Sequence, residues 1–186
     1  MKIFYFDTET TGLDHNKNAI IQLAYIVEID GVEKEEGNIL IQPGISDIVE
    51  PSALQVNGRT HDEIYKAPFL PPADAFAKIM DVLNKYIDRY DKNDKFFPAG
   101  YNVQFDCNFL SSFFTKNGNK FYGSYFEYLK LDPSSLLIFF SITSKVKLES
   151  YKLANVCKHF GIEINAHDAM SDIRATKMLA EKLKTI

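Results

Sequence analysis

The chain has 186 residues, of which 46% are hydrophobic and 25% are charged, so its composition is that of an ordinary globular protein. This length fills one hydrophobic core, and we expect a single domain over residues 1–186. The formal net charge of -4 argues against a protein that coats long nucleic-acid duplexes, because such proteins carry a strongly basic surface.

The first third of the chain predicts an antiparallel meander. Residues 2–7 form a dense apolar run that ends in an acid, as in a buried strand whose carboxyl end opens onto a site. Residues 19–29 are a second β-rich run. The Asp30-Gly31 pair that follows is a strong hairpin signal and predicts an antiparallel return over residues 33–42.

The middle of the chain predicts helices on either side of a further strand. Residues 43–58 are turn-rich, with a short helix near Ala53, and a helix is expected over 73–90 after two prolines. A strand over 95–101 and a helix over 104–115 suggest a parallel crossover.

The last third predicts mostly helix. A final strand is expected over 129–132, followed by helices from Ser134, over 150–160 and over 169–183. This order of elements predicts an α/β fold with a mixed β-sheet, an antiparallel meander followed by parallel strands, flanked by helices.

Nothing in the sequence predicts export or membrane insertion. The apolar run at the N-terminus is too short for a signal-peptide core, and no segment approaches the roughly 20 apolar residues of a membrane span. The two cysteines, Cys107 and Cys157, show no metal-ligand spacing. We therefore expect an intracellular protein in a reducing compartment such as the cytoplasm.

Two carboxylates lie close together at the end of the first predicted strand. Successive strand residues point to opposite faces, so Asp7 and Glu9 project to the same side. Two acids there repel each other and lose hydration unless a cation lies between them. A divalent metal ion explains the pair, although an isolated Asp-x-Glu is more often a turn cap followed by an exposed acid.

Two further acids are candidates for the same site. Asp106 falls early in the helix that follows the 95–101 strand, where sites of parallel sheets assemble; its alternative role is a first-turn acid that favours the helix dipole. Asp172 lies inside the last predicted helix, and we assign the nearby Asp168 to capping. Four converging carboxylates would suit two divalent ions, Mg²⁺ or Mn²⁺, and hence phosphodiester hydrolysis.

Among the four histidines, His167 is the candidate general base. It lies in a predicted turn five residues before Asp172, and its ordinary pKa suits proton abstraction near neutral pH. Its alternative is a solvent-exposed loop histidine. We expect His15 and His61 at the surface and His159 near a helix C-terminus, where a cation is favourable for structural reasons.

Three motifs resemble those of the DnaQ-like family of DEDDh exonucleases: FDTETTGLD at residues 6–14, NVQFDCNFL at 102–110 and HDAMSD at 167–172. Weaker stretches, QLAYI, ALQVNG and YKLANVCKHFGI, extend the similarity over nearly the whole chain. The resemblance implies a ribonuclease H-like fold and removal of nucleotides from the 3′ end of a single strand. Proofreading subunits of bacterial DNA polymerase III belong to the same family.

The resemblance also implies a role for each acid. Asp7 is expected to bridge both metal ions, Glu9 and Asp172 to complete the ligands of one ion, and Asp106 to hold the other. His167 is expected to take the proton.

Residues of the first two motifs are implied to contact the substrate. In the family, the segment after the second acid approaches the terminal nucleotide, and the apolar residue at Leu13 packs against a base whatever its identity. The expected contacts are Thr10, Thr11, Gly12, Leu13, Asn102 and Phe105. One departure is Tyr101, where many members carry histidine.

The sequence leaves several functions open. The TETTG run favours DNA over RNA, and the alternatives are an RNA-trimming exonuclease of the same fold, a non-catalytic nucleic-acid-binding or polymerase-associated module, and a structural protein whose acids only cap and solvate. The chain ends soon after its last helix, so a DNA polymerase, if it is a partner, is expected to bind elsewhere. Lys145, Lys147 and Lys152 either line the path of the strand or form a solvated helix face.

Overall fold

The computed structural model describes residues 1–165 and 168–186. Strands come first in the chain, and helices follow with one further strand among them. The elements in chain order are β1 (Lys2–Thr10), β2 (Ile20–Ile29), β3 (Val32–Leu40), α1 (Pro51–Val56), the 3₁₀ turn η1 (Glu63–Tyr65), α2 (Pro72–Tyr86), β4 (Phe97–Ala99), α3 (Gln104–Lys116), the 3₁₀ turn η2 (Tyr122–Ser124), α4 (Pro133–Ile142), α5 (Leu153–His159) and α6 (Ala169–Leu183).

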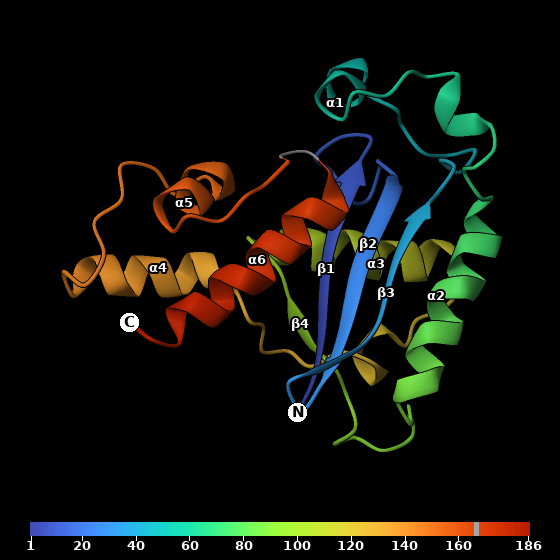
Figure 1. Cartoon of the computed structure of the whole chain (residues 1–186). Coiled ribbons are helices and arrows are strands. Elements are labelled where there is room, and N and C mark those ends of the chain that lie inside the picture. Colours follow the sequence, from blue (N-terminus) through green and yellow to red (C-terminus); the bar gives the residue numbers. More distant parts are fainter. Residues whose placement is uncertain (166–167) are drawn as a thin grey trace.

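A mixed sheet lies at the centre of the molecule, with its strands in the order β3-β2-β1-β4 (Figure 1). β1 pairs with β2 in the antiparallel sense along its whole length and with β4 in the parallel sense from Ile3 to Tyr5. The hairpin between β2 and β3 turns at Asp30 and Gly31, whose φ angles of 51° and 78° are those that a tight two-residue hairpin requires. The predicted meander and mixed α/β sheet are confirmed.

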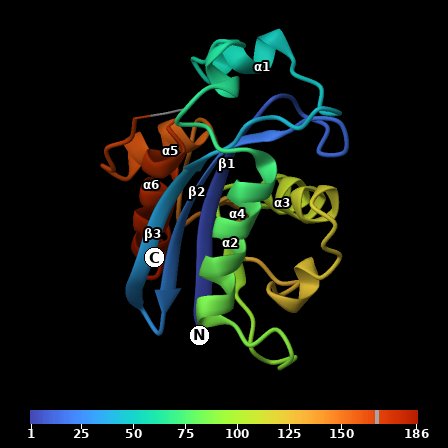
Figure 2. The ribbon, with the colours of Figure 1, turned by 90° about the vertical axis from the view of Figure 1, so that its right-hand side faces the viewer.

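Strand alternation gives β1 two different buried faces. Phe4 and Phe6 pack in the main core with residues of α2 and α3, whereas Tyr5 packs on the other face with Ile173 of α6. Figure 2 shows the resulting layers, with α6 on one side of the sheet and α2 and α3 on the other. β1 is therefore covered on both faces, and a polar side chain near its end is close to one of two helices.

β1 is longer than predicted. The apolar run stops at residue 7, but β2 supplies hydrogen-bonding partners as far as Thr10, which pairs with Ile20 after a register shift. Asp7 and Glu9 consequently lie within the last part of a paired strand and not in a loop beyond it. This places both carboxylates on rigid backbone.

The helix predicted over 73–90 ends early, at Tyr86. The apolar periodicity continues to Ile87, but this residue is buried from an extended backbone. Asp88 then accepts a hydrogen bond from the N–H of Tyr90 at 3.0 Å, a local bond that competes with helix continuation.

The prediction of a strand over 129–132 is wrong. Only Leu131 pairs, by donating to the carbonyl of Pro98 at 2.9 Å and accepting from the N–H of Gly100 at 3.2 Å. The next two residues end the pairing, because Asp132 caps α4 and Pro133 has no N–H to donate. The strand predicted over 95–101 is likewise shortened to β4, and the helix predicted from residue 150 begins at Leu153.

Within the described ranges, no helix has the length and apolar character needed to cross a membrane. Both cysteines are free and buried, Cys107 in α3 and Cys157 in α5.

Candidate active site

The predicted acids come from three elements that meet around the end of β1. Asp7 and Glu9 share the face of β1 that packs on α6, and Asp172 lies in the first turn of α6. Asp106 lies in the first turn of α3, on the opposite face of the sheet. The acids interact electrostatically, since the charges of Asp106 and Asp172 both act on Asp7.

Asp106 is held in one orientation by Thr8, the residue between the two strand acids. The backbone N–H of Thr8 donates to Asp106 Oδ1 at 2.9 Å, and the Thr8 hydroxyl donates to the same oxygen at 2.7 Å. Asp106 is only 4% exposed, and burial raises its pKa to about 7 although both Thr8 bonds oppose the shift. One carboxylate oxygen is thus fixed.

The pKa values of the two strand acids are raised by burial and by the charges of neighbouring acids. Burial is the largest cause at Asp7, and the charges of Asp106, Asp172 and Glu9 add to it, so its pKa lies well above its usual range. Burial, then Asp172 and Asp106, raise the pKa of Glu9 to about 7. Arg59 opposes this shift only as a minor cause. Among the described residues, Arg59 is the only cation that acts appreciably on Glu9, so the negative charge gathered here is only partly balanced by them.

The donor set suits hard divalent cations, because it consists of carboxylate oxygens and carries uncompensated negative charge. In the part of the chain that the structure describes, no group of three or more His, Cys, Asp and Glu side chains is close enough together to hold a metal ion. Binding an ion at this site would therefore bring the side chains closer together. The carboxylates fit divalent cations in their ligand chemistry and their charge, and the backbone elements that carry them are already assembled.

The third motif is described in part. Asp168 is the N-cap of α6 and accepts a hydrogen bond from the N–H of Ser171 at 2.8 Å, which confirms its assignment to capping. Asp172 follows one helical turn later. His167, the expected general base, lies outside the described residues.

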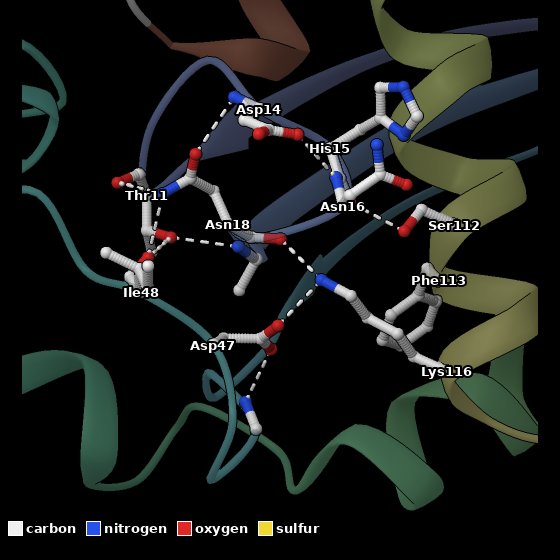
Figure 3. Close-up of polar contacts among 12 residues, drawn as sticks. Thr11, Asp14, His15, Asn16, Asn18, Asp47, Ile48, Ser112, Phe113 and Lys116 are labelled. Atoms are coloured by element: carbon white, nitrogen blue, oxygen red, sulfur yellow. Dashed lines mark hydrogen bonds and ion pairs between the residues drawn. The ribbon is translucent and has the colours of Figure 1, made fainter.

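The segment after β1 is anchored by Asn18, which is 1% exposed. Its side chain accepts from the N–H of Asp14 at 2.9 Å and donates to the carbonyl of Ile48 at 2.9 Å (Figure 3). Thr11 donates its hydroxyl to the same carbonyl at 2.7 Å, and Lys116 of α3 donates to the carbonyl of Asn18 at 2.6 Å. The loop is thereby tied to two other parts of the chain.

Gly12 and Leu13 occupy opposite environments in this loop. A Cβ on Gly12 would lie 2.3 Å from Glu50 Oε1 and 2.4 Å from Asn18, so any other residue would have to displace the side chain that anchors the loop. Leu13 is 83% exposed, and Thr10 is buried with its hydroxyl donating to the carbonyl of Gly12 at 2.8 Å. An exposed apolar side chain thus projects from a fixed loop.

The second motif places its two expected substrate residues differently. Asn102 is exposed and has a φ of 58°, a left-handed conformation that asparagine tolerates, and its N–H donates to Asp132 at 3.1 Å. Phe105 is half-buried, with its ring centroid 4.8 Å from that of Phe109. His15, expected at the surface, is half-buried beside the same Phe109.

Sequence reasoning missed Thr8 and Asn18. Strand alternation places Thr8 on the α3 face, which was a usable signal, because Asp106 was expected near the end of the same strand. Asn18 gave no local signal, since its partners include Ile48 and Lys116, far along the chain.

A mixed sheet covered by helices on both faces, with acids gathered around the end of its central β1 strand, is the architecture of the ribonuclease H-like nucleases. The model of the exonuclease family RNase_T matches residues 4–180, and the chain belongs to this family. The resemblance to DnaQ-like exonucleases that the three motifs carry is thereby confirmed.

Solved structures of Escherichia coli exonuclease I share the fold. The complex with a dT13 oligonucleotide is 23% identical with a TM-score of 0.80, over 99% of this chain and 41% of that chain. The zinc-bound complex with single-stranded DNA is 24% identical with a TM-score of 0.83, over 99% of this chain and 40% of that one. The chain thus spans about two fifths of the length of these structures.

We expect the metal-free protein to lose stability as the pH rises from 4.5 to 7, in part through Glu9. The carboxyl of Glu9 has a pKa of 4.5 when unperturbed and about 7 in the fold, so its cost is absent below the lower value and complete above the higher one. Glu9→Gln removes this cost and should stabilise the protein by ~1–3 kcal/mol at pH 8.

Urea unfolding in the presence of a chelator measures this difference, and the two proteins should have equal stability at pH 4. If the free energy of unfolding of the Glu9→Gln protein depended on pH as that of the wild type does, the claim that Glu9 carries an uncompensated charge in the fold would be refuted.

We also expect Thr8→Val to weaken metal binding, because it removes the hydroxyl bond to Asp106 while it keeps a β-branched side chain. Loss of a partner that orients a ligand typically costs ~10–100-fold in metal affinity. The readout is the Mn²⁺ concentration that gives half of the maximal rise in Tm. Thr8→Ser keeps the hydroxyl and should restore the affinity; equal affinities for Val and Ser would contradict the orienting role.

Proposed function

We propose that the chain is a 3′-to-5′ exonuclease that hydrolyses the terminal phosphodiester bond of single-stranded nucleic acid, with DNA favoured over RNA, and releases 5′-mononucleotides. Residues 1–186 form its exonuclease domain in this proposal. The observation that carries it is the set of acids around the end of β1, where burial raises the pKa values of Asp7, Glu9 and Asp106 and neighbouring acids add to the shifts at Asp7 and Glu9.

The proposed metal ligands are Asp7, Glu9, Asp106 and Asp172, and the proposed cofactors are two ions of Mg²⁺ or Mn²⁺. Such ions, when bound, supply a more acidic water and a counter-charge for the leaving oxygen. The uncompensated charge of the buried acids supports this assignment, because the described cations near Glu9 act on it only weakly. The bonds from Thr8 supply one oriented carboxylate before any ion arrives.

His167 is the proposed general base, and it would accept the proton of the attacking water. This assignment rests on the HDAMSD motif and on the ordinary pKa of imidazole.

The proposed contacts to the terminal nucleotide come from the first two motifs. The exposed side chain of Leu13 on its anchored loop supports stacking against a base without regard to sequence. The absence of a side chain at Gly12 keeps the turn of this loop tight. The remaining proposed contacts are Thr10, Thr11, Asn102 and Phe105.

DNA is favoured because the exonuclease I structures with the same fold hold DNA oligonucleotides. A DNA polymerase is a proposed partner only through the motif resemblance to proofreading subunits.

End-labelled single strands incubated with Mg²⁺ or Mn²⁺ should shorten from the 3′ end. Asp7→Asn should slow this trimming by at least ~100-fold, because a shared metal ligand loses its charge. Asp168→Asn is the matched control, since asparagine keeps the helix cap and removes one neighbouring charge.

Equal trimming by Asp7→Asn and wild type would refute the assignment of Asp7. Matched DNA and RNA strands should show faster cleavage of DNA, and the reverse order would identify an RNA-trimming enzyme. Binding without hydrolysis in either metal would identify a non-catalytic module.

The trimming rate at saturating Mg²⁺ should rise with pH as His167 loses its proton. Saturating metal removes proton competition at the carboxylates, so their titration does not contribute. His167→Ala should lower the rate by ~10²–10⁴-fold and flatten the rise. A pH–rate profile of unchanged shape in this variant would remove the base role.

A further inference from the structure

A hollow of about 580 Å³ lies between the loop before α5 and the outer surface of this helix. Val156 and Cys157 of α5 are buried in the core, so the helix presents Asn155, Lys158 and His159 to the hollow. Lys147, Ser150 and one acid, Glu149, line it from the loop. We call this feature the α5 basic hollow.

The charge of this region is opposite to that of the whole chain. Residues 145–159 contain four lysines and one histidine against a single acid, Glu149, whereas the chain as a whole has a net charge of -4. Unpaired positive charge in a concave surface attracts anions more strongly than the same charge on a convex one, because low-dielectric walls focus the field.

Three of the four lysines of the region are available to a ligand, whereas Lys145 donates to the carbonyl of Ile186 at 2.8 Å. Lys147, Lys152 and Lys158 are exposed, and in residues 1–165 and 168–186 none of them forms an ion pair. Lys85 and Lys116, by contrast, each bind a carboxylate of the protein.

The loop that lines the hollow is hydrogen-bonded to the residue directly before the second motif, which begins at residue 102. The hydroxyl of Tyr101 donates to the carbonyl of Tyr151, which follows Ser150 directly. The Tyr101 ring packs with the cluster that contains Val156, and the next residue along the chain is Asn102. Tyr101 therefore joins the loop that lines the hollow to the segment that leads into α3 and Asp106.

We propose that the α5 basic hollow binds phosphate groups of a single nucleic-acid strand whose 3′ end lies in the active site. The hollow supplies lysine ammonium groups for the phosphates and neutral donors from Ser150 and Asn155. It would hold the strand upstream of the reacting bond and so favour longer substrates. This inference rests on the proposed exonuclease function and names a second contact for its substrate.

The test is a Lys147→Gln/Lys158→Gln double variant, which removes two charges and keeps most of each side chain. The Kd for a 20-nucleotide strand should rise about tenfold near 0.1 M salt, and the slope of log Kd against log salt should fall by about 1.4, at about 0.7 per phosphate contact. The KM of this strand should rise in parallel, whereas kcat and the KM of a trinucleotide should stay unchanged.

The control is Lys34→Gln/Lys78→Gln, which removes the same charge from β3 and α2, on the side of the molecule away from α5 (Figure 1). It should bind both strands as the wild type does. An equal loss in the control, or equal effects on the trinucleotide and the 20-nucleotide strand, would overturn the hollow as a strand contact.

Binding is measured by fluorescence anisotropy in the Asp7→Asn background, so its outcome is independent of turnover. Active wild type with no length-dependent loss in the double variant would refute the hollow and leave the exonuclease function standing. Length-dependent loss of binding, together with no hydrolysis by the wild type, would support the hollow and refute the proposed function. A second measurement uses the protein without the lysine substitutions. It determines the slope of log Kd against log salt for strands of different length, so it does not depend on whether a lysine variant folds.

Discussion

Repulsion among carboxylates around the end of β1 is the constraint on which the site depends. Asp7, Glu9 and Asp106 all have raised pKa values, and burial is the first cause in each. Side chains that repel one another stay together only if the backbone elements that carry them cannot separate. β1 meets this requirement because it pairs with β2 along its whole length, pairs with β4 from Ile3 to Tyr5, and is packed on both faces in a large apolar core that opposes the cost of the acids.

The same requirement of rigidity extends to the loop that follows β1. Its anchor, Asn18, is buried and satisfied by backbone groups from two segments, while Lys116 links the loop to α3. A loop held in this way can expose Leu13 without the entropic cost of fixing a mobile segment when a ligand binds. The strand that carries the acids and the loop that carries the apolar side chain are therefore both held in place before a ligand binds.

Local sequence patterns predicted the features that depend on local periodicity. Alternation along β1 placed Asp7 and Glu9 on one face, and the capping role of Asp168 followed from its place before a helix. The errors arose where tertiary contacts override the pattern: Ile87 keeps its burial on extended backbone, and Leu131 pairs alone because Asp132 and Pro133 start a helix. The bonds between Thr8 and Asp106 join residues 98 positions apart, so strand alternation could give the face on which Thr8 lies but not its partner.

Charge is distributed unevenly in the molecule, and this distribution suits a polyanionic ligand. The chain has a net charge of -4, so long-range electrostatics oppose the approach of a nucleic acid. At each place where phosphates come close to the protein, local positive charge has to offset the repulsion between the phosphates and the negatively charged chain. In the proposed function, divalent ions would meet this need among the acids, where lysine ammonium groups would be drawn into ion pairs with the carboxylates. Away from the acids, Lys147 and Lys158, which form no ion pair with the described residues, would meet it with no metal ion, so the proposed reacting contacts are separate from the proposed contacts that only hold the strand.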